Sequence, residues 1–137
     1  MEQRLSFVTL AVADVERSHA FYIERVGWEA TTYVPGEVLM IRVGGLVMLS
    51  LWSESGFESE VGQLRRGSGH APITLAHNVA TRGEVDRVLV EAAEAGAEVS
   101  PAKEREWGGY TGYFADPDGF RWEIAWNPGP EGALVLP

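Results

Sequence analysis

The sequence predicts an α+β fold built from two successive modules, each with the order strand, helix, strand, strand, strand. Short apolar runs bounded by turn residues predict the strands, and two segments with apolar residues three and four positions apart predict the helices. These two helical segments occupy the same place in each half of the chain. The 137 residues suit one domain with module one at about 5–53, a linker at 54–70, module two at about 71–127 and a tail at 128–137.

The first module begins with a mostly apolar run, residues 5–12, which predicts a buried strand. Asp14 is a candidate N-cap for the helix that follows, because its short carboxylate can accept hydrogen bonds from the free backbone N–H groups of the first turn. Gly27 is expected to end this helix. Pro-Gly and Gly-Gly pairs then separate three predicted strands at residues 28–34, 38–43 and 46–52.

The second module repeats this order after a polar segment rich in Ser, Gly and Glu. Thr81, with Glu84 three residues later, forms the pattern of a capping box at the start of the second helix, and Gly96 is expected to end it. The Asp116-Pro117-Asp118-Gly119 sequence is typical of a tight turn between two strands. The predicted strands of this module are residues 73–79, 98–102, 110–115 and 120–126.

Composition and charge exclude several functional classes. No cysteine is present, which excludes disulfides and thiolate chemistry. With 20 acidic and 11 basic residues the net charge is −9, so neither nucleic acid nor an anionic membrane is expected as a partner. No apolar run approaches the roughly 20 residues that span a bilayer. The N-terminal residues lack the pattern of a signal peptide, and a cytoplasmic location is therefore expected.

Two stretches carry a resemblance to a known family. Residues 6–14, followed by Phe21-Tyr22 and Val26-Gly27-Trp28, resemble the opening module of the vicinal-oxygen-chelate superfamily, and residues 107–124 resemble its closing strands. This superfamily includes glyoxalase I, bleomycin-resistance proteins and extradiol dioxygenases. The similarity covers about residues 5–128. It implies paired modules that form a U-shaped cup, and it favours a homodimer, as do the edge strands that an open sheet leaves uncovered.

The resemblance also implies where a divalent metal would be held in metal-using members. The four positions fall on Phe7, Ser50 (within one position), Pro72 and Glu123. Only Glu123 is a good ligand, because the side chains at the other three positions offer at most one hydroxyl. A catalytic ion needs three or four donors from the protein. The three histidines, His19, His70 and His77, do not stand at ligand spacing. We therefore expect no metal cofactor and keep a divalent metal as the alternative.

Period-two alternation predicts which side chains line the cup. If Glu123 faces inward, it is either a general base or the partner of a cationic ligand, or it forms a structural pair with Arg121 or Arg42. Trp107, Tyr110 and Tyr113 border a Gly-Gly step and serve either packing or ligand binding. The ligand-binding candidates are Phe7, Thr9, Ser50, Trp52, Pro72, Thr74, Trp107, Tyr110, Tyr113 and Arg121.

These observations favour a metal-free small-molecule-binding protein of the glyoxalase and bleomycin-resistance type, which sequesters an aromatic or cationic compound in the cup. The alternatives are a divalent-metal-dependent lyase, isomerase or dioxygenase, and a metal-independent enzyme that uses Glu123 as a base. Whether any reaction is catalysed stays open at this point. The expected partners are a small-molecule ligand and a second copy of the chain.

Overall fold

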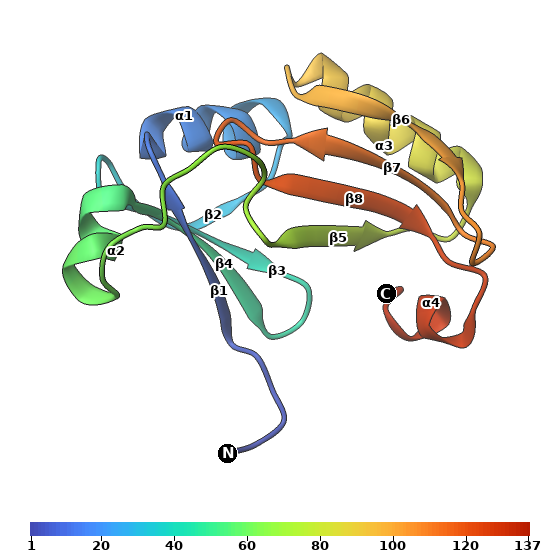
Figure 1. Cartoon of the computed structure of the whole chain (residues 1–137), viewed down its shortest axis with the longest axis horizontal. Helices are drawn as coiled ribbons and strands as arrows, with labels where there is room; N and C mark the ends of the chain where they lie inside the picture. Colours follow the sequence, from blue (N-terminus) through green and yellow to red (C-terminus); the bar gives the residue numbers. More distant parts are fainter. The chain divides into compact units, whose positions relative to one another are not determined.

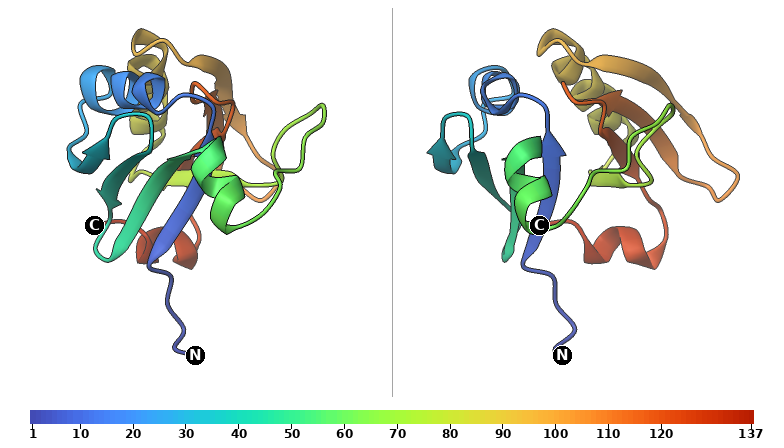
Figure 2. Two further views of the ribbon diagram at one scale, coloured as in Figure 1. Left: turned by 90° about the vertical axis from the view of Figure 1, so that its left-hand side faces the viewer. Right: turned by 60° about the vertical axis from the view of Figure 1, so that its left-hand side comes forward.

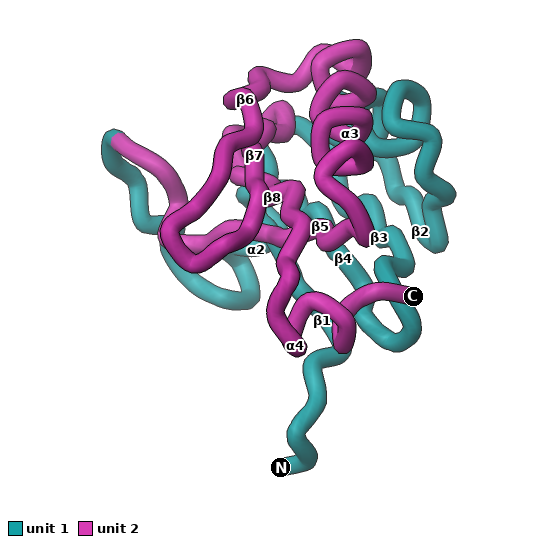
Figure 3. The backbone as a smooth tube through the Cα atoms, turned by 90° about the vertical axis from the view of Figure 1, so that its right-hand side faces the viewer, with its two compact units in different colours: residues 1–68 teal, residues 69–137 magenta.

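The computed structural model describes residues 1–137, and the chain divides into two compact units, Met1–Ser68 and Gly69–Pro137 (Figures 1 and 3). Each unit holds one four-stranded mixed sheet and its own helices. The predicted α+β class with two modules of the same order is therefore confirmed. The boundary between the units lies inside the segment predicted as a linker.

Unit 1 pairs its first strand in parallel with its last strand, and its other neighbouring strands are antiparallel, in the order β1-β4-β3-β2. Because the chain must cross over to make the parallel pair, the helix after β1 lies on one face of the sheet. The elements are β1 (Phe7–Val12), α1 (Val15–His19), η1 (Ala20–Arg25), β2 (Ala30–Val34), β3 (Val38–Val43), β4 (Val47–Ser53) and α2 (Glu54–Glu60).

The helix after β1 begins at its predicted cap, where the Asp14 carboxylate accepts a 2.9 Å hydrogen bond from the Arg17 amide. Its second half is a π-helix, in which the Val26 amide donates to the Phe21 carbonyl five residues earlier. Gly27, at φ +84°, ends it as expected. The helix covers an apolar sheet face whose fully buried side chains include Val12, Leu39, Ile41, Leu49 and Leu51.

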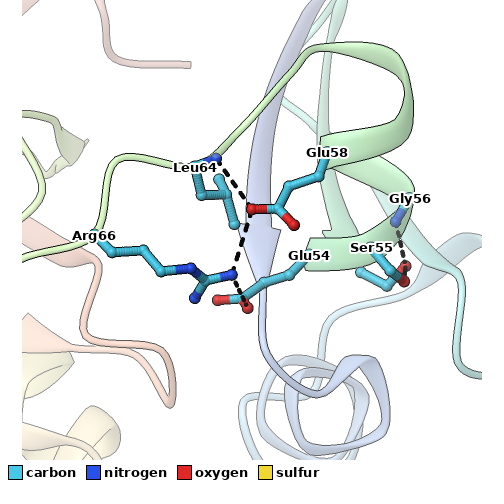
Figure 4. A network of polar contacts seen from close by, with 7 residues as sticks. Glu54, Ser55, Gly56, Glu58, Leu64 and Arg66 are labelled. Atoms are coloured by element: carbon cyan, nitrogen blue, oxygen red, sulfur yellow. Dashed lines mark hydrogen bonds and ion pairs between the residues drawn. The ribbon is translucent and has the colours of Figure 1, made fainter.

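The segment predicted as a linker is partly helical, which corrects the sequence interpretation. Ser53 caps α2 by accepting a 3.2 Å hydrogen bond from the Gly56 amide, and Figure 2 shows α2 beside β1. Arg66 then forms ion pairs with Glu54 at 3.0 Å and Glu58 at 3.4 Å, which ties the following chain back to α2 (Figure 4). Polar composition concealed this helix, because Phe57 is its one large apolar side chain and no apolar stripe is present.

Unit 2 repeats the arrangement with the order β5-β8-β7-β6, and β5 is parallel to β8. The segment after β8, expected only as a tail, contains a short helix that begins with a proline at its first position. The elements are β5 (Thr74–Asn78), α3 (Arg82–Glu94), β6 (Glu98–Glu104), β7 (Tyr110–Ala115), β8 (Arg121–Trp126) and α4 (Pro130–Leu134).

Helix α3 packs on one face of this sheet. Thr81 caps it as predicted by accepting a 3.2 Å hydrogen bond from the Glu84 amide. Val85 and Leu89 are buried against the sheet, where Trp122 stacks on Phe114 with ring centroids 5.9 Å apart. No helix in the molecule combines the length and the apolar character needed for a bilayer crossing.

The predicted Asp-Pro-Asp-Gly turn joins β7 to β8. The buried Asp116 carboxylate accepts hydrogen bonds from the amides of Asp118 at 3.0 Å and Phe120 at 2.9 Å. Gly119 adopts φ +85°, which a residue with a Cβ rarely does. This turn fixes the register in which the functional candidates of β7 and β8 face each other.

Candidate functional site

The pairing of β7 with β8 sorts the candidate residues of unit 2 between two faces. Tyr113 pairs directly with Glu123, and Thr74 pairs with Arg121 on the other side of β8. Paired residues project to the same face of a sheet. Since Trp122 and Ile124 are buried on the α3 side, Glu123 and Tyr113 project from the face opposite α3.

Glu123 is held by one hydrogen bond. The Tyr113 hydroxyl donates to Glu123 Oε1 at 2.9 Å, and the other oxygen, Oε2, has no partner within the chain. Every buried side-chain nitrogen or oxygen has a partner, so Oε2 is open to solvent on a half-buried side chain. Burial raises the pKa of Tyr113, and the hydrogen bond to Glu123 raises it further, so the phenol keeps its proton and remains a donor.

Arg105 completes this group, although the sequence analysis did not select it. Its Nε donates to Thr111 Oγ1 at 2.6 Å and its Nη2 donates to the Thr111 carbonyl at 3.3 Å. The guanidinium carbon lies 5.6 Å from the centre of the Tyr113 ring. The predicted strand stopped at residue 102, whereas β6 continues to Glu104 through a register shift that brings Arg105 beside β7.

Trp107 lies at the tip of the loop between β6 and β7. The loop is closed by the Arg105 amide, which donates to the Gly109 carbonyl at 2.8 Å. The indole of Trp107 folds back over Gly109, where a Cβ atom would stand 1.8 Å from the ring, and 54% of the residue is exposed. The glycine is therefore needed for the indole to occupy this place.

Tyr110 is not brought together with Tyr113. Its hydroxyl donates to Asp86 on α3 at 2.8 Å, which places it on the α3 face. That hydrogen bond is the main reason why the pKa of Tyr110 is raised, with burial second. Arg82 lies 4.6 Å from the centre of the Trp126 ring on the same face. The sheet thus separates Tyr110 from the Glu123 group.

The two arginines considered as structural partners of Glu123 have other partners. Arg42 donates to the Gly45 carbonyl in unit 1 through Nη2 at 2.6 Å. The Arg121 guanidinium lies 3.7 Å from the carboxylate of Glu98. The backbone carbonyl of Arg121 also accepts a 3.0 Å hydrogen bond from the Thr74 hydroxyl. Glu123 is therefore engaged by a phenol and not by either of these cations.

The unit 1 candidates share the face opposite α1. Thr9 pairs with Ser50, and Phe7 is two positions from Thr9 on the same strand. Ser50 is buried (3% exposed), whereas Phe7 is 50% exposed. Trp52 lies against α2, because a Cβ on Gly56 would stand 3.1 Å from its indole nitrogen. The remaining candidate, Pro72 of unit 2, is exposed and precedes β5, outside the paired strands.

Comparison with known proteins decides the family. Residues 4–124 match the family described as the Glyoxalase/Bleomycin resistance protein/Dioxygenase superfamily. The chain belongs to this superfamily. The resemblance inferred from the sequence is thereby confirmed. Comparison of the sequence with curated proteins gave no match.

Solved structures of this superfamily resemble the chain over nearly its whole length. A glyoxalase-related enzyme from Fulvimarina pelagi is 34% identical, with a TM-score of 0.81 over 93% of this chain and 90% of that one. A glyoxalase/bleomycin resistance protein/dioxygenase from Nocardioides is 23% identical, with a TM-score of 0.79 over 94% and 89%. Lactoylglutathione lyase from Agrobacterium tumefaciens is 20% identical, with a TM-score of 0.72 over 93% and 96%. The last two likenesses concern the fold alone.

The residues at the four positions that the sequence resemblance implies for a metal do not fit a catalytic ion. Phe7 and Pro72 have no donor atom in their side chains, and Ser50 offers one hydroxyl. Glu123 is the one strong ligand of the four, and its Oε1 already accepts from Tyr113. Nowhere in the chain do three or more His, Cys, Asp or Glu side chains gather in a way that could hold an ion. We therefore derive no step through a metal.

Proposed function

We propose that this superfamily member binds a small aromatic or cationic molecule on the face of β7 and β8 opposite α3. Glu123 is the residue that contacts the ligand's positive or hydrogen-bond-donating group. The observation that carries this proposal is the state of its carboxylate, with Oε1 fixed by Tyr113 and Oε2 open to solvent. An oriented carboxylate with a free oxygen is prepared for a charge-assisted hydrogen bond.

Aromatic side chains on β7 and on the loop before it support an aromatic ligand. The Tyr113 ring lies on the same face as Glu123, and the exposed indole of Trp107 belongs to the loop that leads into β7. Flat rings offer large apolar contact at little cost in side-chain entropy.

The proposal includes no resident metal, because three of the four superfamily positions lack a strong donor. A divalent-metal lyase, isomerase or dioxygenase needs ligands from elsewhere. Metal analysis of protein purified without added ions distinguishes the metal-free binding protein from such a metal enzyme. A stoichiometric ion that a chelator removes together with ligand binding would contradict the metal-free proposal.

A homodimer and a cytoplasmic location are further parts of the proposal. Both sheets end in strands that use only one of their two edges, and covering such edges favours self-association. Sedimentation equilibrium tests the dimer, and cell fractionation tests the location.

Titration of tryptophan fluorescence with benzylamine tests the role of Glu123. The wild-type protein is expected to bind, and Glu123→Gln to bind about tenfold more weakly, because it loses a charge-assisted contact. Glu91→Gln is the matched control, since Glu91 is an exposed carboxylate on α3 whose partner is Arg87. Equal affinity of wild type and Glu123→Gln, or no binding by the wild type, would refute the proposal.

A second candidate function is a metal-independent enzyme with Glu123 as general base. The observation that favours it is the 34% identity to a protein described as a glyoxalase-related enzyme. In that case Glu123→Gln abolishes turnover while ligand affinity changes little, because the amide keeps the shape of the side chain but cannot take up a proton. A binding protein shows the opposite pattern, with weaker binding and no turnover to lose.

A further inference from the structure

The basic residues of unit 2 are unevenly partnered. Arg82 and Arg87 extend from α3, and each forms an ion pair, with Glu104 at 2.8 Å and with Glu91 respectively. Arg82 also covers the Trp126 ring. These two cations are therefore engaged within the protein. The three other basic residues of the unit are Lys103, Arg105 and Arg121.

These three cations lie on or beside the face that carries Glu123. Lys103 pairs in register with Thr111, which is next but one to Tyr113 on β7. Arg121 is next but one to Glu123 and has Glu98 as its partner at 3.7 Å. Neither Lys103 nor Arg105 has a carboxylate within ion-pair distance. In a chain of net charge −9, acidic side chains are plentiful, so two unpaired cations beside one half-buried carboxylate single out this face.

Arg105 is fixed in position without being neutralised. Its Nε and Nη2 donate to Thr111, a residue with no exposed surface. Its Nη1 has no hydrogen-bond partner in the chain, and because no buried polar atom lacks a partner, Nη1 is open to solvent. A guanidinium held in this way loses little side-chain entropy when it binds an anion, and its planar shape suits a carboxylate or phosphate.

Tyr113 connects the positive and negative groups of this face. Its ring lies 5.6 Å from the Arg105 guanidinium carbon, and its hydroxyl is 2.9 Å from Glu123. Arg105 and Glu123 are thus separated by about one tyrosine side chain. We propose that Arg105 binds an acidic group of the ligand while Glu123 binds a basic group, so that the preferred ligand is an aromatic molecule carrying both charges. This inference rests on the proposed function and names its ligand class.

Four probes of one ring size test the inference: benzyl alcohol, benzylamine, benzoate and 4-(aminomethyl)benzoate. The last carries both charges across one ring. Affinities are measured by tryptophan fluorescence and by chemical shifts in ¹⁵N-labelled protein. We expect the wild type to bind 4-(aminomethyl)benzoate about tenfold more tightly than benzylamine, as one additional charge-assisted contact predicts.

Variants assign this gain to one residue. Arg105→Gln is expected to remove the tenfold preference for 4-(aminomethyl)benzoate over benzylamine. Arg105→Lys keeps the charge but loses the contacts with Thr111, and we expect it to retain part of the preference. Arg87→Gln removes the same charge from α3 and should keep the full preference. If Arg105→Gln does not fold, the preference for 4-(aminomethyl)benzoate over benzylamine is compared between Arg105→Lys and the wild type, and a smaller preference in Arg105→Lys supports the role of Arg105.

The outcomes separate this inference from the function on which it rests. If the wild type binds benzylamine through Glu123 but gains nothing from the added carboxylate, the role of Arg105 is refuted and the proposed function stands. The same holds if Arg105→Gln and Arg87→Gln both keep the preference. If none of the four probes binds the wild type, the proposed function fails and the inference fails with it.

Discussion

The hydroxyl of Tyr113 donates a 2.9 Å hydrogen bond to Oε1 of Glu123, between residues that stand directly opposite each other on β7 and β8. The bond crosses the sheet face that α3 leaves uncovered. It orients the Glu123 carboxylate without using both of its oxygens. A carboxylate held in this way is suited to contact a ligand rather than to satisfy the core.

Tyr113→Phe should reduce the loss of stability at alkaline pH. Burial, and then the hydrogen bond to Glu123, raise the pKa of Tyr113 in the folded protein. Its stabilising contribution is therefore complete below the unfolded pKa of about 10 and is lost as the pH rises from there through the folded pKa. Urea unfolding at several pH values from neutral to alkaline measures how steeply the free energy of unfolding falls as the pH rises.

Two other tyrosines with raised pKa values also contribute to the fall of the free energy of unfolding at alkaline pH. The pKa values of Tyr33 and Tyr110 are also raised, by burial first for Tyr33 and by the hydrogen bond to Asp86 first for Tyr110. The alkaline loss should thus become smaller in Tyr113→Phe without disappearing. If the free energy of unfolding of Tyr113→Phe falls with pH as steeply as that of the wild type, the pKa of Tyr113 is not raised in the folded protein.

Gly109→Ala should displace the indole of Trp107. A Cβ at this position would stand 1.8 Å from the ring, far inside van der Waals contact, so the ring must leave its place over residue 109. We expect red-shifted tryptophan emission and stronger quenching by acrylamide. Gly45→Ala is the control, because its Cβ meets nothing within 4 Å. An unchanged spectrum in Gly109→Ala would contradict the placement of Trp107.

Gly112→Ala should destabilise unit 2. The new Cβ would lie 2.4 Å from Leu89 Cδ1 and 3.0 Å from the backbone of β6, so the Leu89 side chain and the neighbouring backbone must shift. Overpacking of this kind costs about 1–3 kcal/mol. Gly83→Ala near the start of α3 meets open space, and it should leave stability unchanged or raise it by up to about 1 kcal/mol. Thermal and urea unfolding of the Gly112→Ala and Gly83→Ala variants measure both effects. Equal stability of these two variants would disprove the close packing at Gly112.

Much of the fold follows from local signals in the sequence. Asp14 and Thr81 cap their helices as expected, and the Asp116 turn sets the register of β7 and β8. The π-helical half of the first helix, in which Phe21 and Tyr22 are buried, could not be foreseen. Apolar periodicity indicates which face is buried and not which hydrogen-bond ladder the backbone adopts.

The candidate site was only partly predictable. Glu123 and Arg121 alternate with Trp122 as period two requires, and the same rule would have separated Tyr110 from Tyr113, because positions three apart lie on opposite faces of a strand. Arg105 carried no comparable signal. Its place depends on the irregular pairing of β6 with β7, which a sequence pattern does not reveal.

The most direct test of the account is a chemical-shift titration of ¹⁵N-labelled protein with benzylamine. We expect saturable shifts centred on the amides of Thr111, Tyr113 and Glu123, and their loss in Glu123→Gln but not in Glu91→Gln. Shifts centred instead on the α3 face around Asp86 and Tyr110, or equal affinity in wild type and Glu123→Gln, would contradict the assignment of ligand binding to Glu123.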